Sequence, residues 1–209
     1  MHKNINYFHG QYKKYGTALI EPKSYVNPLD CKDFQELKIC CDKVEKEFIK
    51  IGDAGEENFL SVGRFMTDIK KPTIVKNSYS KKVIQILGKK KYVNLFKKII
   101  GVDENEKIYL RRIQFNQINK GCFVGYHLDI DSNPDYIAAV VIQFGENYLG
   151  GKYRVYNSKV KFRDYTPKKK SIIVSDCNYP HEVTKVTKGE RQSLVFFISK
   201  NYDKNKRKN

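Results

Sequence analysis

The sequence predicts an α+β protein in which helices in the N-terminal half precede a β-rich core of the jelly-roll type. Two stretches with helical periodicity lie between residues 30 and 100, and six short β-rich segments separated by turn residues follow Gly101. Strands of that length and spacing are typical of a sandwich or barrel. The 209 residues suit one domain, which we expect to span residues 1–200, helical to about residue 105 and jelly-roll from about 106.

The first helical pattern begins at Asp30 and predicts an amphipathic helix that ends before Gly52. Its apolar residues recur at steps of three and four: Phe34, Leu37, Cys41, Val44 and Phe48. A second pattern runs from Ser80 to Ile100, and Gly88 is expected to divide it into two helices. Each stretch presents one apolar face, so we expect both to pack on the outside of the β core.

Six segments rich in β-branched and aromatic residues predict the strands of the core. They are residues 107–118, 135–145, 151–157, 171–176, 181–187 and 191–199. Residues 201–209 are polar and basic, and we expect them to form a mobile tail.

The chain carries a formal charge of +17, from 40 Lys and Arg residues against 23 Asp and Glu residues. Such a charge attracts polyanions, which makes nucleic acid a candidate partner. The lysines are scattered rather than gathered in one stripe, and this favours the alternative that they solvate exposed faces.

The five cysteines show no C-x-x-C pair and no zinc-type spacing, which predicts a reducing, cytoplasmic location rather than a disulfide framework. No run of 18 apolar residues is present and the N-terminal residues lack an apolar signal core. We therefore expect neither secretion nor a membrane partner.

The segment "GYHLDID" places His127 and Asp129 two residues apart in a stretch that predicts a strand, where their side chains would share one face. If the strand carrying His181 lies alongside, the three side chains meet. Two imidazoles and one carboxylate on one face of an octahedron suit non-haem Fe(II), and zinc would fit the same ligands less diagnostically. Ten residues after His181, Arg191 could grip a carboxylate bidentately, and Ser193 could add a hydroxyl to that grip.

Four segments together resemble the core of the Fe(II)/2-oxoglutarate-dependent dioxygenases, and most of all the prolyl-4-hydroxylase-like branch. They are "GCFVGYHLDID", "VVIQFGENYLGGKYRVY", "TPKKKSIIVSD" and "HEVTKVTKGERQSLVFFIS", in that order, and the resemblance covers residues 108 to 199. It implies a double-stranded β-helix, also called jelly-roll or cupin-like, flanked by helices. It also implies Fe(II), 2-oxoglutarate as cosubstrate and O2, with ascorbate as reductant.

Residue by residue, the resemblance implies that His127, Asp129 and His181 hold the iron. Arg191 would hold the distal carboxylate of 2-oxoglutarate, with Ser193 as its helper. The paired glycines 150 and 151 match the turn that begins one strand, and Gly189 matches the turn that delivers Arg191.

The chain departs from the branch at Ile118, in the segment where many relatives carry a tyrosine that helps hold the cosubstrate. Gln143 and Asn116 are the polar residues that could substitute for it. Gln143 lies in an otherwise apolar strand, where a buried amide needs partners, so the alternative is a bond to neighbouring backbone.

The resemblance implies hydroxylation of an unactivated carbon. The segment "HLDIDSNPDYIAAVVIQFG" is similar to the small free-standing oxygenases that act on free amino acids, so we expect a free amino acid or an amino-acid-like small molecule as substrate. Asp131 or Asp135 could receive the substrate ammonium. A peptidyl prolyl or lysyl side chain is the nearest alternative. Less favoured are a nucleic-acid substrate, because the segment after Arg191 lacks the second arginine of alkylation-repair relatives, and a non-catalytic jelly roll that binds nucleic acid through its lysines.

Overall fold

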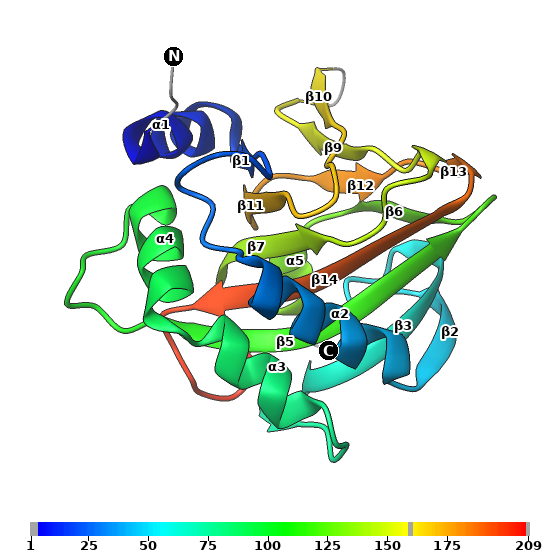
Figure 1. Ribbon diagram of the computed structural model, residues 1–209, viewed down its shortest axis with the longest axis horizontal. Coiled ribbons are helices and arrows are strands. Elements are labelled where there is room, and N and C mark those ends of the chain that lie inside the picture. The colour runs from blue at the N-terminus through cyan, green and yellow to red at the C-terminus, as the bar shows by residue number, and fades with distance from the viewer. Residues whose placement is uncertain (1–3, 159–160, 208–209) are drawn as a thin grey trace.

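The computed structural model describes residues 4–158 and 161–207, and it confirms the predicted combination of helices with a jelly-roll core (Figure 1). The helices are α1 (Ile5–Tyr15), α2 (Cys31–Lys43), α3 (Ser80–Leu87), α4 (Lys90–Ile100) and the short α5 (Asp129–Ser132). The N-terminal strands are β1 (Thr17–Ile20), β2 (Lys46–Ile51), β3 (Glu57–Asp68) and β4 (Pro72–Ile74). The later strands are β5 (Tyr109–Asn119), β6 (Phe123–His127), β7 (Tyr136–Gln143), β8 (Leu149–Gly150), β9 (Tyr153–Tyr156), β10 (Phe162–Tyr165), β11 (Ile172–Asp176), β12 (His181–Val183), β13 (Val186–Lys188) and β14 (Glu190–Ser199).

Twelve of the strands described form a continuous antiparallel sheet that folds back on itself. Its order is β1-β11-β7-β14-β5-β3-β6-β12-β9-β10, with β2 and β4 paired to β3. β8 and β13 pair with each other in a separate two-stranded sheet. We call β1, β11, β7, β14, β5, β3, β2 and β4 the major sheet and β6, β12, β9 and β10 the minor sheet. β3 joins the two, because its residues 61–66 pair with β5 and its residues 58–59 pair with β6.

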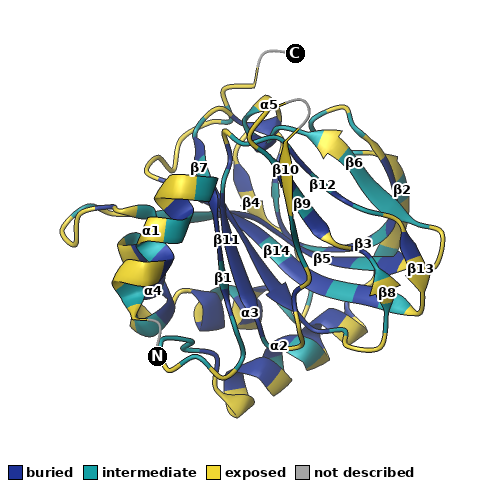
Figure 2. Ribbon diagram, turned by 90° about the horizontal axis from the view of Figure 1, so that it is seen from above, coloured by how far each residue is buried: buried dark blue, intermediate teal, exposed yellow. Residues whose placement is uncertain are grey.

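The major sheet is covered by helices on one face and by the minor sheet on the other (Figure 2). Alternation along β7 shows this division: Val140 and Ile142 belong to the core shared with the helices, whereas Val141 belongs to the core between the sheets. The second core is the smaller one, and the cavity described below opens within it.

The segment from Val44 to Ile51 differs from the prediction. Helix α2 ends at Lys43, and Val44 adopts an extended conformation with ψ of 138°. Residues 46–51, "KEFIKI", form β2 and pair with β3, which leaves Phe48 and Ile51 more than half exposed. The spacing of Phe48 after Val44 fits a helix, but the aromatic and β-branched residues of this segment also fit a strand, and pairing with β3 decides between them.

The two helices between Ser80 and Ile100 and their division at Gly88 are confirmed. Residues 1–105 also contribute β1 to β4, which the periodicity did not indicate. Within the described ranges, the part predicted as a tail makes specific contacts: the Asn205 side-chain amide donates to the carbonyl oxygens of Asp68 and Ser132 at 2.6 and 3.0 Å. None of the helices in these ranges combines the length and apolar character that crossing a membrane requires.

Candidate metal and cosubstrate site

His127 and His181 lie opposite each other on neighbouring antiparallel strands. β6 ends at His127, β12 begins at His181, and the two residues are in register. Their ring centroids are 4.3 Å apart. The strands that carry the two histidines therefore lie side by side, which was the condition for a shared site.

Asp129 completes the cluster from a helix rather than from the strand. β6 ends at His127, Leu128 is extended, and Asp129 is the first residue of α5. Its Oδ1 lies 3.4 Å from Nε2 of His127 and its Oδ2 lies 3.6 Å from Nε2 of His181. The predicted convergence of the three side chains is correct, but the turn into α5 brings it about instead of a shared strand face.

Both imidazoles are held by backbone carbonyls on the side away from Asp129. Nδ1 of His127 is 2.8 Å from the Gly125 carbonyl oxygen, and Nδ1 of His181 is 3.1 Å from that of Tyr179. A carbonyl oxygen can only accept a hydrogen bond, so each Nδ1 must carry the proton. Each Nε2 then faces the carboxylate of Asp129. Histidines that bind metals are oriented in this way.

Burial and the charge of Asp129 have opposite effects on the pKa values of the two histidines. Burial favours neutral imidazole and lowers the pKa of His181. At His127 burial acts in the same direction, but the hydrogen bond and charge of Asp129 outweigh it and raise the pKa to about 9. Oδ2 of Asp129 is buried without a hydrogen-bond partner among the described residues. A buried carboxylate with one unpartnered oxygen lies next to two Nε2 atoms. Together these atoms form a set of ligands suited to a cation.

Arg191 lines the same cavity and is 1% exposed. Its Nη1 donates to the Ser193 hydroxyl at 3.3 Å, whereas Nε and Nη2 have no partner in the described part of the chain. No carboxylate there forms an ion pair with this guanidinium. A buried cation with two unsatisfied donors fits an anionic group that enters the cavity.

Glycines shape the approach to Arg191. Gly189 has φ of +70°, and a Cβ there would lie 2.1 Å from the Asn147 carbonyl oxygen. Gly151 has φ of +57°, and a Cβ there would lie 3.0 Å from Cδ of Arg191. The turn before β14 and the space beside the guanidinium therefore both require glycine.

Of the two residues considered as substitutes for the missing tyrosine, Asn116 lies at the cavity and Gln143 does not. Asn116 lines the cavity and accepts a hydrogen bond from the Gln114 side chain at 2.9 Å. Gln143 is fully buried, donates to the Gly145 carbonyl at 3.1 Å, and lies outside the cavity lining, although its Oε1 is unpartnered. Ile118 is buried in the core between the sheets.

Asp131 and Asp135, considered for the substrate ammonium, are not brought to the cavity. Asp131 is exposed, and Asp135 forms an ion pair with Lys206 at 3.2 Å. Neither residue is part of the lining.

Sequence reasoning missed several polar residues of the lining, among them Tyr153, Arg112 and Glu56. Tyr153 was accessible to it, because alternation in "KYRVY" places Tyr153 and Val155 on the buried face. Its hydroxyl is buried without a partner among the described residues. Burial raises the pKa of Tyr153 well above its usual value, and the negative charge of Asp129 acts in the same direction. The other two residues depend on a bulge and on a turn, which no local pattern indicates.

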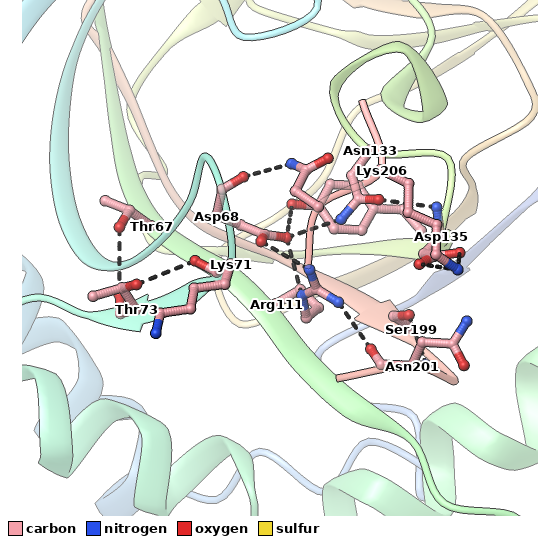
Figure 3. Close-up of polar contacts among 12 residues, drawn as sticks. Thr67, Asp68, Lys71, Thr73, Arg111, Asn133, Asp135, Ser199, Asn201 and Lys206 are labelled. Carbon is pink, nitrogen blue, oxygen red and sulfur yellow. Dashed lines mark hydrogen bonds and ion pairs between the residues drawn. The ribbon is translucent and has the colours of Figure 1, made fainter. Parts of the chain in front are cut away.

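A buried polar network fixes the segment that carries Asp129. Asp68, at the end of β3, accepts hydrogen bonds from Arg111 of β5 and from the side chains of Asn133 and Tyr136 (Figure 3). Asn133 follows α5 directly and its N–H bonds the Asp129 carbonyl oxygen at 3.3 Å. The position of Asp129 is thus tied to the major sheet.

Comparison with known proteins agrees with this site. Residues 113–199 match the family model described as the 2OG-Fe(II) oxygenase superfamily. A solved structure described as an oxidoreductase of the 2OG-Fe(II) oxygenase family from Burkholderia pseudomallei is 30% identical, with a TM-score of 0.88 over 98% of this chain and 95% of that one. The comparison with curated proteins gave no match.

Two more distant structures share the fold. A prolyl hydroxylase from Trichoplax adhaerens, in complex with a peptide fragment of hypoxia inducible factor, is 15% identical with a TM-score of 0.64, over 94% of this chain and 89% of that one. The non-haem α-ketoglutarate-dependent epimerase SnoN of nogalamycin biosynthesis is 9% identical with a TM-score of 0.69, over 93% and 80%.

Proposed function

This chain belongs to the 2OG-Fe(II) oxygenase superfamily, and from that premise we propose that it hydroxylates an unactivated carbon of a free amino acid or a similar small molecule. It is a 2-oxoglutarate-dependent dioxygenase, with Fe(II), 2-oxoglutarate and O2 as its cofactor and cosubstrates. The proposed reaction converts substrate C–H, 2-oxoglutarate and O2 into substrate C–OH, succinate and CO2.

His127, Asp129 and His181 would hold the iron. Their ligand atoms lie within 4.8 Å of one another, and two imidazoles with one carboxylate leave half of an octahedron free. Iron bound there supplies the redox chemistry by which O2 oxidises the cosubstrate and then the substrate C–H bond. Ascorbate would keep it reduced.

Arg191 and Ser193 would hold the distal carboxylate of 2-oxoglutarate. The observation that carries the proposal is the fully buried Arg191, whose two unpartnered N–H groups share a cavity with the His-Asp-His cluster. Tyr153 offers an unpartnered hydroxyl at the same cavity, and Asn116 adds a polar side chain. The surrounding apolar residues exclude water from the reacting atoms.

A small substrate is favoured by the shape of the cavity. Its volume is about 70 Å³, so the cavity has room for small groups only. The alternative is a peptidyl prolyl or lysyl substrate, which the shared fold with a peptide-bound prolyl hydroxylase supports. The net charge of +17 keeps a nucleic-acid substrate as a weaker third candidate. Five free cysteines support our proposal of a cytoplasmic location.

The test is succinate formation by the purified protein given Fe(II), ascorbate and 2-oxoglutarate. A panel of free amino acids is compared with prolyl and lysyl peptides for stimulation of succinate release. Asp129→Ala should abolish turnover and iron binding, the latter measured by equilibrium dialysis, whereas Asp164→Ala, outside the cavity, should keep both. Succinate release that is equal in wild type and Asp129→Ala would refute the site, and stimulation by peptides alone would select the peptidyl alternative.

A further inference from the structure

Arg112 reaches the cavity through a bulge in β5. In the pairing of β5 with β14, Phe196 faces Ile113 and Phe197 faces Arg111, so Arg112 is left without a partner. Its φ is +38°, a strained conformation for a residue with a side chain. Bulges next to active sites re-aim a side chain, and here the bulge aims a guanidinium into the cavity.

The Arg112 guanidinium is held in place by neighbouring side chains, but not all of its N–H groups are hydrogen-bonded. Nη2 forms an ion pair with Asp53 at 2.7 Å and Nε donates to Gln114 at 3.2 Å, while the group lies over the Phe197 ring at 5.5 Å. Nη1 makes no hydrogen bond with the described residues. A fixed, 9% exposed guanidinium with a free donor is suited to a carboxylate.

Glu56 supplies the opposite charge in the same cavity. Its carboxylate accepts hydrogen bonds from the Asn58 side chain at 2.9 Å and from the Ala54 N–H at 3.1 Å. No lysine, arginine or histidine of the described residues lies within ion-pair distance of it. Glu56 lines the cavity together with His127 and His181. An oriented carboxylate without a cation fits a substrate ammonium.

We propose that Arg112 binds the carboxylate and Glu56 the ammonium of an α-amino acid, so that the substrate is a free zwitterion. This inference rests on the proposed function and names the residues that select its substrate. A residue inside a peptide has neither charge. The pair therefore distinguishes a free amino acid from a peptidyl residue.

The test measures binding rather than turnover. Each of the twenty free amino acids is titrated calorimetrically, without O2, into protein loaded with Fe(II) and 2-oxoglutarate. The tightest is compared with its N-acetyl and carboxamide derivatives. We expect each cap to weaken binding to the wild type about 10-fold or more, since each removes one charge-assisted contact.

Variants test which residue binds the ammonium of the substrate and which binds its carboxylate. Glu56→Gln should lose the preference for the free ammonium and Arg112→Gln the preference for the free carboxylate, whereas Glu56→Asp and Arg112→Lys should retain part of each. Glu47→Gln and Arg64→Gln, which break a surface ion pair on β2 and β3, should keep both preferences.

Two failures are distinguishable. Equal affinity for free and capped forms, in an enzyme that decarboxylates 2-oxoglutarate, would overturn the roles of Arg112 and Glu56 alone. No binding by any free amino acid would overturn both these roles and the proposed free amino-acid substrate. A wild type that forms no succinate under any condition would overturn the proposed function. Preferences that persist unchanged in Glu56→Gln and Arg112→Gln would also overturn the inference.

Discussion

Asp68 and Arg111 form a bidentate ion pair whose two side chains are fully shielded from solvent. Nε and Nη2 of Arg111 reach the two carboxylate oxygens at 3.0 and 2.8 Å, and Nη1 donates to the Asn201 carbonyl. The pair joins β3 to β5 and, through Asn133, to the segment that carries Asp129. Arg111 thus stabilises the segment that carries Asp129 without lining the cavity, whereas its neighbour Arg112 lines it.

Removing one partner of this pair is expected to destabilise the protein strongly. Asp68→Ala or Arg111→Met should each lower the free energy of unfolding by about 3–5 kcal/mol, because a buried charge is left without its partner. Urea unfolding measures this. Glu146→Gln, which breaks the exposed contact with Lys169, should cost less than about 1 kcal/mol. Similar small losses at all three positions would contradict the prediction.

Arg191→Gln should weaken 2-oxoglutarate binding on the order of 100-fold, because a charge-assisted bidentate contact is worth a few kcal/mol. Anaerobic calorimetry with the Fe(II)-loaded protein measures the affinity. Arg154→Gln is the control, because Arg154 pairs with Asp164 and Glu182 outside the cavity. If both substitutions weaken binding equally, Arg191 has no specific role.

Tyr153→Phe separates a binding role from a structural one. The hydroxyl has no partner in the described part of the chain, so its removal should leave thermal stability without cosubstrate unchanged or slightly higher. The affinity for 2-oxoglutarate should fall about 5-fold or more, by loss of one hydrogen bond. Tyr165→Phe, outside the cavity, should leave the affinity unchanged. An unchanged affinity in Tyr153→Phe would assign the ring to packing alone.

Stability below pH 4 should depend on Asp33, at the start of α2. Burial acts to raise the pKa of this carboxyl, but hydrogen bonds from two lysines and a tyrosine lower it to about 2. The donors are Lys89, Lys91 and Tyr92. Because the folded pKa is below the unfolded one, the stabilisation is present above about pH 4 and is lost as the pH falls toward 2.

Asp33→Asn tests this linkage. Its difference from the wild type in free energy of unfolding should shrink steadily between about pH 4 and pH 2. Denaturant titrations at several pH values give the difference directly. A difference that does not change with pH would show that the ion pairs do not account for the stabilisation.

Local periodicity was sufficient for the helices between Ser80 and Ile100, because the apolar face is encoded by residues three and four apart. It was insufficient for residues 46–51, where the same spacing is compatible with a strand and only the pairing with β3 selects it. The order of the motifs identified the histidines, Asp129 and Arg191 before any geometry was available.

The sequence by itself determined the β-rich core, the family resemblance and four side chains that meet at the cavity: His127, Asp129, His181 and Arg191. Only the tertiary structure decided that Asp129 comes from α5, that Asp131 faces solvent, and that Arg112 and Glu56 line the cavity. The physical reason is separation along the chain, because periodicity and short motifs are encoded by residues that are close in sequence. The bulge at Arg112 instead depends on the register between β5 and β14, which are distant in the chain, and Glu56 is placed by the turn that joins β2 to β3.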